Sequence, residues 1–311
     1  MAYRDRVRPN YHLGRGRGRG RGGLAQQPWR SSTLEPTRPG PDHPAGAVSQ
    51  SLCKPDLTTE AQMLKGQAVI TGSRLVASYS WLDTPTPTIL IPGKPPKWTP
   101  LPTPTKLDED SEEYFRDPNG ARYPDHPTEP AVLASLAEEP KLPSTVDIVC
   151  CSSTLGNLLR FVRGQEQAFR MSLEIVGNTV FLIRRENSPR EIIPNVRGYG
   201  HTFPEAYTTW GSDVKGSCSH QRIMRYSFGG LNIMTRFEAD GYIAADDSEA
   251  ALNVAPTTSS NTLEDPGDEI SNAIHDLKVL TTMNNSKELK VRKGGCLVDQ
   301  AFIFDLKTRG L

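Results

Sequence analysis

The sequence predicts a mixed α+β fold, an α/β arrangement with a mixed sheet, behind a long N-terminal region that is disordered. Three observations support this prediction. Of the 26 prolines, 21 precede residue 146, and proline interrupts both helices and sheet ladders. Beyond residue 146, one segment has the apolar spacing of an amphipathic helix. Two pairs of β-rich runs in the same part of the chain flank glycine turns.

Residues 1–69 are predicted to form a disordered, Arg-Gly and proline-rich tail. Residues 14–23 read GRGRGRGRGG, and residues 1–40 hold nine arginines against one aspartate and one glutamate. Such segments bind RNA through charge and guanidinium stacking. The arginines that offer this contact are Arg15, Arg17, Arg19 and Arg21. A solvated tail without a specific partner explains the composition equally well.

Residues 70–145 are predicted to form an extended, proline-rich arm followed by an acidic linker. The arm, VASYSWLDTPTPTILIPGKPPKW, contains two tryptophans, a tyrosine and the apolar run Ile89 to Ile91. We expect it to lie along the folded domain. Residues 105–140 then contain ten acidic residues and three basic ones.

The folded domain is predicted over residues 146–311, beginning with a helix. In STLGNLLRFVRG, four apolar residues have the i, i+3, i+4, i+7 spacing of one helix face: Leu155, Leu158, Leu159 and Val162. MSLEIVGNTVFLIRRE then predicts a hairpin that turns at Gly177 and Asn178.

A second helix and a second hairpin follow. In GYGHTFPEAYTTW, Thr202 and Glu205 have capping-box spacing, and Pro204 lies in the first turn. The second hairpin turns at Gly229 and Gly230. A disordered insertion is expected at about residues 246–270, and KELKVRKGG and AFIFDLKTR are predicted as the last two strands.

Composition excludes several classes of protein. Five cysteines without C-x-x-C spacing argue against a zinc site or a redox pair, and we expect free thiols in a reducing compartment. No apolar run approaches the roughly 18 residues of a membrane span. We therefore expect an intracellular protein of the nucleus, the cytoplasm or both, without a membrane partner. No DDxxD motif occurs, so a prenyl-diphosphate (geranylgeranyl) synthase role is not supported.

Two segments carry charged side chains in an alternating pattern. Because successive side chains point to opposite faces of a strand, Arg236, Glu238 and Asp240 of FEADGY are predicted to share one face. In AFIFDLKTR the same rule places Asp305, Lys307 and Arg309 opposite Phe302, Phe304 and Leu306.

These acids indicate a divalent metal site. Mg²⁺ or Mn²⁺ prefers oxygen ligands, which Glu238, Asp240 and Asp305 would supply. Lys307 would orient a nucleophile or stabilise the charge of a pentacovalent phosphorus. The chemistry would be nucleic-acid hydrolysis. Charged faces are also ordinary on exposed strands, where they prevent edge-to-edge aggregation, so that interpretation stays open.

Other residues are weaker candidates. Glu205 could be a further metal ligand, although its capping box explains it without chemistry. His201 and His220 could act as general bases, but each lies beside a turn or a helix start, where a surface histidine needs no function. A basic groove for phosphates is suggested by five arginines on predicted strands, although ordinary exposed faces have the same composition: Arg184, Arg185, Arg222, Arg225 and Arg236.

The order of helix, hairpin, helix, hairpin with FEADGY, and FDLKTR resembles the PD-(D/E)XK nuclease superfamily. Within it, the pairing of E-x-D with D-L-K-T is similar to the decapping and RNA 5′-end quality-control nucleases that act on incompletely capped RNA. Across residues 70–310, the same segments together with VASYSWLDTPTPTILIPGKPPKW are similar to a group of fungal proteins.

The resemblance implies a nuclease-like core in which Glu238 and Asp240 match the E-x-D acids. Asp305 and Lys307 match the E-x-K pair, with aspartate in place of glutamate. In that superfamily a helix and a strand normally follow, whereas this chain stops at Leu311, so we expect a C-terminally truncated domain.

Two functions remain open. The first is metal-dependent hydrolysis of RNA at its 5′ end, or a degenerate relative of that activity. The second is non-catalytic RNA binding or scaffolding. The sequence does not indicate an oligomeric state.

Overall fold

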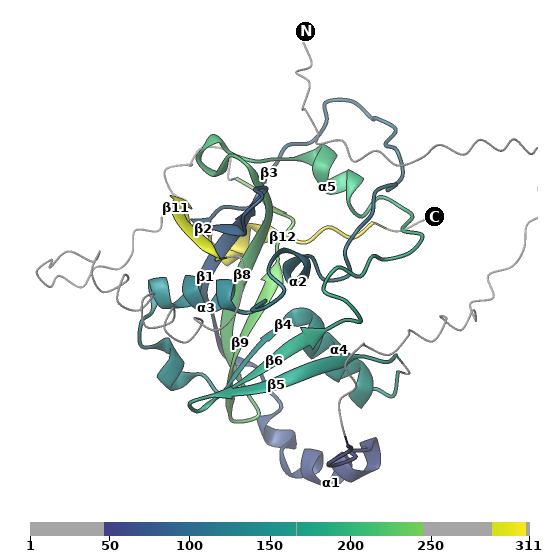
Figure 1. Ribbon diagram of the computed structural model, residues 1–311, viewed down its shortest axis with the longest axis vertical. Coiled ribbons are helices and arrows are strands. Elements are labelled where there is room, and N and C mark those ends of the chain that lie inside the picture. Colours follow the sequence, from purple (N-terminus) through teal and green to yellow (C-terminus); the bar gives the residue numbers. More distant parts are fainter. Residues whose placement is uncertain (1–46, 166, 245–287, 309–311) are drawn as a thin grey trace, which may run out of the picture. The chain divides into compact units, whose positions relative to one another are not determined.

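A computed structural model describes residues 47–165, 167–244 and 288–308 of the chain (Figure 1). The Arg-Gly segment with Arg15, Arg17, Arg19 and Arg21 lies outside the described residues, as do the insertion expected at 246–270 and Arg309. In the described part, no helix is long and apolar enough to cross a membrane.

Five α-helices occur in the described residues. They are α1 (Lys54–Met63), α2 (Pro118–Arg122), α3 (Glu129–Glu138), α4 (Ser152–Val162) and α5 (Thr202–Tyr207). Four 3₁₀ turns accompany them: η1 (Lys65–Gln67), η2 (Leu142–Thr145), η3 (Ser212–Val214) and η4 (Gln300–Phe302).

The strands of the described residues form two sheets. The larger has the order β11-β2-β1-β8-β9-β4-β6-β5. Its strands are β1 (Thr71–Leu82), β2 (Thr88–Gly93), β4 (Ile148–Cys151), β5 (Arg170–Val176), β6 (Thr179–Arg185), β8 (Ser217–Phe228), β9 (Leu231–Glu238) and β11 (Lys290–Gly295). The smaller has the order β12-β10-β3-β7 and consists of β3 (Lys97–Trp98), β7 (Thr208–Thr209), β10 (Gly241–Tyr242) and β12 (Ile303–Phe304).

The large sheet is mixed, which confirms the predicted fold class. β4 pairs in parallel with both β6 and β9, and β11 pairs in parallel with β2. The remaining neighbours are antiparallel. Since β4, β6 and β9 run in the same direction, their carboxyl ends meet at one edge of the sheet.

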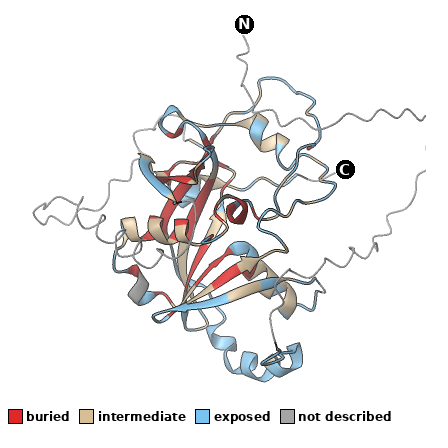
Figure 2. Ribbon diagram, viewed as in Figure 1, coloured by how far each residue is buried: buried red, intermediate tan, exposed pale blue. Residues whose placement is uncertain are grey.

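Helices pack on both faces of the large sheet. On one face, Tyr79, Trp81 and Ile223 are buried with Ala131 and Ala134 of α3. On the other, Leu155 and Leu158 of α4 pack against a second cluster, which consists of Cys150, Leu182 and Ile233. Figure 2 shows the buried residues concentrated along β1, β2 and β8, the middle of the sheet. The core therefore depends on strands from both sides of residue 146.

The segment predicted as an arm is a central part of this sheet. β1 pairs with β8 over most of its length, and Tyr79 and Ala77 are fully buried. Trp81 donates its indole N–H to Oδ1 of Asn119 in α2 at 2.7 Å. The expectation of an arm outside the domain is therefore wrong. Pro92 lies near the end of β2, and none of the twelve residues of β1 is a proline.

The acidic linker is also corrected. Phe115 forms a bridge with Ile192, and Arg116 forms an ion pair with Glu191 at 3.0 Å. The segment is therefore held against the loop before α5. An acidic composition is shared by linkers and by surface segments that form specific contacts, so composition alone does not distinguish the two.

The helices and hairpins predicted beyond residue 146 are confirmed. α4 spans the four predicted apolar residues, of which Leu155 and Leu158 pack against the sheet whereas Leu159 and Val162 are exposed. β5 pairs with β6 across Gly177, whose φ is 59°. β8 pairs with β9 across Gly229 and Gly230, with φ of 60° and 82°. Positive φ at both central residues is the requirement of a type I′ turn, which glycine meets without strain.

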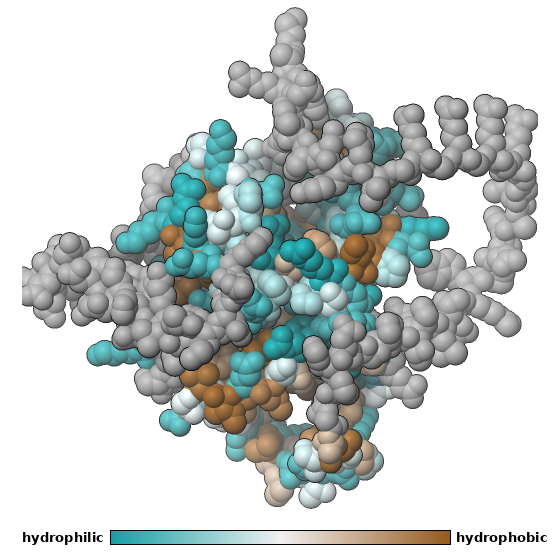
Figure 3. Space-filling model, viewed as in Figure 1, coloured by the Kyte–Doolittle hydropathy of each residue, from teal (hydrophilic) through white to brown (hydrophobic). Residues whose placement is uncertain are grey.

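One edge of the large sheet exposes apolar side chains. Leu173, Ile175 and Val176 of β5 are 67%, 74% and 62% exposed. Figure 3 shows apolar side chains in the lower part of the view, where Figure 1 places β5 and α1. Strand β5 pairs with β6 alone among the described strands.

Candidate functional site

Asp240 lies where the chain passes from one sheet to the other. The large sheet continues through Ala239, whose N–H donates to the carbonyl of His220 at 3.0 Å. Two residues later, Gly241 and Tyr242 pair with β12 and thus belong to the small sheet. Asp240 is the residue between these two sets of hydrogen bonds.

Strand β12 brings the second acidic segment to Asp240. The N–H of Leu306 donates to Oδ2 of Asp240 at 2.6 Å, and the carboxyl groups of Asp240 and Asp305 are hydrogen-bonded to each other. Lys307 donates from Nζ to Oδ1 of Asp305 at 2.5 Å. The structure therefore joins three of the four predicted residues.

The two carboxyl groups have different proton affinities. Burial, together with the hydrogen bond that the protonated carboxyl group donates to Asp305, raises the pKa of Asp240 to about 6. At Asp305, burial acts in the same direction but is outweighed by the hydrogen bonds from Lys307 and Asp240, so its pKa is lowered. Asp305 is thus the charged member of the pair near pH 6, and Asp240 is the member that holds a proton.

Glu238 does not join this pair. It is the last residue of β9 and lies opposite Gln221 of β8. The residue as a whole is exposed, but its carboxyl group is partly withdrawn from water by the surrounding protein. This burial raises its pKa, against the opposing effects of Gln221, Arg236 and Arg122. Among the described residues, no three His, Cys, Asp or Glu side chains meet in a metal-binding group.

The prediction that Arg236, Glu238 and Asp240 share one face is therefore corrected, and with it the metal site of three carboxylates. Side-chain alternation holds only within one strand, and β9 ends at Glu238 before the chain changes sheets at Asp240. Arg236 and Glu238 do lie on one face of β9, as alternation predicts. Burial lowers the pKa of Arg236, but its hydrogen bond with Tyr79 and the nearby Asp117 outweigh that effect and raise it.

FDLKTR is also less regular than predicted. Phe302 ends the 3₁₀ turn η4, and the strand that follows spans only Ile303–Phe304. Phe304 packs edge-on against Trp98, with ring centroids 5.6 Å apart. Asp305 and Lys307 follow the strand as irregular backbone and are exposed. Their position beside Asp240 thus depends on the two residue pairs between β10 and β12 and on the hydrogen bond from the N–H of Leu306 to Asp240.

Helix α5 borders the site through Trp98. The centroid of the Trp98 ring lies 5.6 Å from that of Tyr207, on which it stacks, and 6.4 Å from that of Phe203. Phe304 of β12 contacts the same Trp98 ring. The aromatic residues link α5 to the segment that carries Asp305.

The start of α5 is capped differently from the prediction. No side-chain capping bond comes from the helix itself. Instead the buried Asp110 accepts from the N–H of Thr202 at 2.9 Å and from that of His201 at 3.2 Å. These bonds lower the pKa of Asp110 against the effect of burial. The capping-box explanation of Glu205 is therefore wrong, and Glu205 is simply exposed.

Neither histidine candidate is placed as a general base. The His201 ring stacks on Tyr114, with centroids 3.6 Å apart. His220 is 1% exposed, and its Nδ1 lies 2.9 Å from Oγ of Ser80. Burial, together with the charge of Arg222, lowers the pKa of His220 well below its ordinary value, so this imidazole is neutral.

Arg222 is likewise not part of a surface groove. It is fully buried, donating from Nε to Gln300 at 3.0 Å and from Nη2 to the carbonyl of Val298 at 2.8 Å. It therefore anchors the segment that leads into β12. Sequence reasoning missed this role and that of Asp110, because both depend on partners 76 or more residues away.

The residues at Asp240 fit a divalent cation. Mg²⁺ is commonly held by one or two carboxylates, with water and phosphate oxygens completing its shell. Asp240 and Asp305 provide two carboxyl groups in contact with each other. Lys307 neutralises only Asp305 directly.

Comparisons with solved structures give weak similarities. The crystal structure of S. pombe Rai1 has a TM-score of 0.37 and 11% identity, over 58% of this chain and 56% of that one. A mutant S. pombe Rai1 in complex with 3′-FADP has a TM-score of 0.34 and 11% identity, over 57% and 55%. Scheffersomyces stipitis Rai1 in complex with (3′-NADP)+ and calcium ion has a TM-score of 0.37 and 12% identity, over 70% and 65%. This chain thus spans 55% to 65% of the length of these proteins.

No curated protein matches the sequence. The family described as "Domain of unknown function (DUF8563)" matches residues 60–297. That range begins at the end of α1 and includes all but one strand of the large and small sheets. It ends just before η4 and β12. The chain belongs to the DUF8563 family.

Proposed function

We propose that the protein is a metal-dependent nuclease that hydrolyses phosphodiester or pyrophosphate bonds at the 5′ end of RNA, in the nucleus or cytoplasm. The observation that supports this most is the contact between Asp240 and Asp305, with Lys307 bonded to Asp305. The order of E-x-D and D-x-K motifs agrees with the sequence resemblance to 5′-end quality-control nucleases.

Asp240 and Asp305 would hold Mg²⁺ or Mn²⁺. When bound, such an ion supplies Lewis-acid stabilisation of phosphate oxygens and lowers the pKa of bound water. Lys307 is exposed and would place its ammonium beside a non-bridging phosphate oxygen, where it stabilises developing negative charge. Glu238, the last residue of β9, would orient the attacking water through a hydrogen bond.

The exposed position of Glu238, apart from the aspartate pair, favours the second candidate function: a non-catalytic RNA-binding or scaffolding protein that retains the same fold. The two candidates differ in one measurable property. Only the enzyme requires divalent metal affinity that depends on Asp240.

Calorimetric titration of the full chain with MnCl₂ tests the proposal. We expect one bound ion, and no binding to Asp240→Asn, whereas Glu60→Gln, an exposed acid on α1, should bind like the wild type. Hydrolysis of 5′-triphosphorylated and capped RNA should follow the same pattern. Lys307→Met should lower kcat while keeping the metal. RNA binding without Asp240-dependent metal affinity would instead establish the non-catalytic function.

A further inference from the structure

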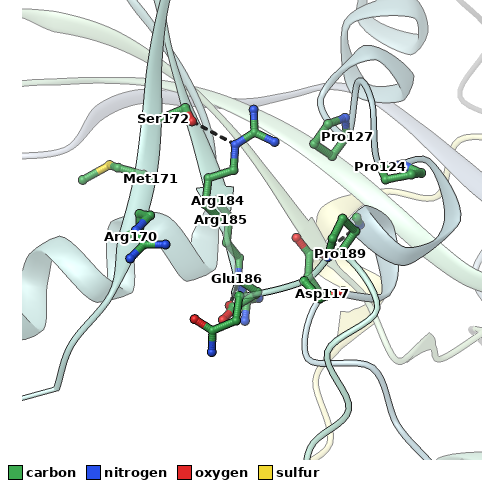
Figure 4. Close-up of a pocket in the computed structure, with 13 residues that line it drawn as sticks. Asp117, Pro124, Pro127, Arg170, Met171, Ser172, Arg184, Arg185, Glu186 and Pro189 are labelled. Atoms are coloured by element: carbon green, nitrogen blue, oxygen red, sulfur yellow. Dashed lines mark hydrogen bonds and ion pairs between the residues drawn. The ribbon is translucent and has the colours of Figure 1, made fainter. Parts of the chain in front are cut away.

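An open cavity of about 600 Å³ lies between the β5–β6 hairpin and the loop after α2 (Figure 4). Arg170, Arg184 and Arg185 line it from the hairpin. Asp117 and Pro127 line the opposite wall. Its volume lies within the range of about 300–1,000 Å³ that is typical of ligand sites.

The cavity lies at the same sheet edge as the candidate active site. β4, β6 and β9 are parallel, and their last residues are Cys151, Arg185 and Glu238. Ligands of open sheets with parallel strands bind beyond the carboxyl ends of those strands. A ligand in the cavity would therefore be on the side of the sheet edge that leads to Glu238 and Asp240.

A smaller cavity of about 20 Å³ adjoins the large one. It shares Asp117, Pro127 and Arg184 with the large cavity and is also lined by Arg236. Nη1 of Arg236 is buried and has no hydrogen-bond partner among the described residues. A buried guanidinium donor that lacks an acceptor is costly, and the small cavity has room for about one water molecule that would satisfy it.

The arginines of the large cavity have donors left for a ligand. Arg185 donates from Nε to Oγ of Ser172 at 2.8 Å, which fixes its side chain across the cavity, as Figure 4 shows. Nη2 of Arg185 lies 3.7 Å from Oε1 of Glu174, and such an ion pair at the surface is weak. Arg184 is paired with Glu186 at 2.6 Å. Arg170 has no ion pair among the described residues and is exposed.

The lining indicates which part of a nucleic acid would be bound. Three guanidinium groups face two acids in the wall, Asp117 and Glu186, and no aromatic ring is present. Guanidinium groups bind phosphate in a bidentate manner, whereas base recognition in single strands uses aromatic stacking. The cavity therefore suits the phosphate backbone rather than the bases.

We propose that this cavity binds the phosphates of single-stranded RNA downstream of its 5′ end, without base preference. The inference rests on the proposed function for the position of the 5′ end at Asp240 and Asp305. Arg170 and Arg185 are the principal phosphate contacts.

The test measures binding of a fluorescent ten-nucleotide oligouridylate to the full chain in EDTA, where no hydrolysis occurs. The double variant Arg170→Ala/Arg185→Ala should bind about tenfold more weakly, and the slope of log Kd against log salt should fall by about 1.4, since single strands contribute roughly 0.7 per phosphate contact. Arg163→Ala/Arg292→Ala, two exposed arginines on α4's C-cap and β11, is the matched control. The salt slope of the control should equal that of the wild type.

Photocrosslinking of a 4-thiouridine oligonucleotide provides a second measurement. Crosslinks should map to residues 170–189 in the wild type and be lost in the double variant, whereas binding by the Arg-Gly tail gives crosslinks before residue 40. An unchanged salt slope in the double variant, or crosslinks confined to the tail, overturns the proposal.

The outcomes for cavity and active site are separable. If Asp240→Asn abolishes hydrolysis and the double variant raises KM for the ten-nucleotide RNA but leaves that for a dinucleotide unchanged, both proposals hold. If crosslinks map to 170–189 but no metal binds, the cavity stands and the nuclease does not. Hydrolysis with an unchanged KM in the double variant leaves the nuclease and removes the cavity.

Discussion

The N–H of Leu306 donates a 2.6 Å hydrogen bond to the carboxylate of Asp240. This bond joins two segments that are 66 residues apart in the sequence, and it holds Asp305 and Lys307 at the point where the chain changes sheets. The geometry of the candidate site depends on it and on the two residue pairs between β10 and β12.

Replacing Gly241 with alanine should separate these two segments. A Cβ at this position would lie 2.4 Å from Cζ of Phe304 and 2.9 Å from the carbonyl oxygen of Pro96. Because the contact with Pro96 is to backbone and the Phe304 ring is also packed against Trp98, β10 must shift relative to β3 and β12, at a cost of about 1–3 kcal/mol. Manganese titration should show about tenfold weaker binding, with urea unfolding as the stability measurement.

Gly156→Ala is the matched control for this substitution. Gly156 lies inside α4 with no atom within 4 Å of an added Cβ. Alanine there should stabilise the protein by about 0.5–1 kcal/mol and leave metal affinity unchanged. Wild-type metal affinity in Gly241→Ala would contradict the predicted role of the β10–β12 pairing.

Metal affinity should depend on pH through Asp240. Since its pKa is about 6, the carboxyl group is protonated below that pH, and a cation must displace the proton. We expect affinity to be constant above pH 7 and to fall by about tenfold per pH unit below pH 6. Calorimetry with MnCl₂ between pH 5 and 7.5 measures this.

The origin of the raised pKa can be tested separately. In Asp305→Asn the carboxylate that opposes ionisation of Asp240 is absent, so the pKa of Asp240 should fall, while the effect of burial remains. Carbon-detected NMR titration of the aspartate side chains reports both groups. Metal affinity that is flat from pH 5 to 7.5 would show that the two carboxyl groups do not share a proton.

Stability should decrease in mild acid because of His220. Its pKa is lowered in the folded protein but is about 6.5 in the unfolded chain. The unfolded state therefore binds a proton that the folded state does not, and the free energy of unfolding falls below pH 6.5 by up to ~1.4 kcal/mol per pH unit. Urea unfolding at pH 7.5, 6.5 and 5.5 measures the slope.

His220→Asn should reduce that slope, because asparagine does not titrate. The exposed His126 offers a control, since His126→Asn should leave the slope as in the wild type. Equal slopes for the wild type and His220→Asn would show that His220 is protonated in the folded state.

Arg222→Lys should loosen the segment that precedes β12. Lysine carries all its donors on one nitrogen and cannot reproduce the two separate nitrogens, Nε and Nη2, from which the guanidinium bonds Gln300 and the carbonyl of Val298. We expect a loss of about 2 kcal/mol in unfolding free energy and faster hydrogen exchange at residues 296–304. Arg225→Lys is the control, since within the described residues Arg225 forms one hydrogen bond, to the carbonyl of Thr145, from a single nitrogen. Unchanged exchange in Arg222→Lys would refute the anchoring role.

Local chemistry in the sequence was sufficient for several elements. The Leu155–Leu158 spacing predicts α4, and the paired glycines at 229 and 230 predict the β8–β9 turn, because both depend on residues a few positions apart. Alternation correctly placed Arg236 and Glu238 on one face of β9. The carboxyl groups of Asp240 and Asp305 and the amino group of Lys307 also indicated a metal site from the sequence alone.

Longer-range features could not be obtained in this way. Proline content suggested that β1 and β2 lay outside the domain, yet Tyr79 and Trp81 complete its core. The cap of α5 comes from Asp110 in an acidic stretch that composition assigned to a linker. Each outcome depends on partners that are distant in sequence, whose contacts carry no local pattern.

The sequence by itself therefore determined the fold class, the hairpins, α4 and the kinds of side chain available for chemistry, since short-range propensity and side-chain alternation govern these. Only the tertiary structure decided that Asp240 meets Asp305 while Glu238 stays apart. The reason is physical: the chain leaves the large sheet after Ala239, and alternation ends where the strand's hydrogen bonds end.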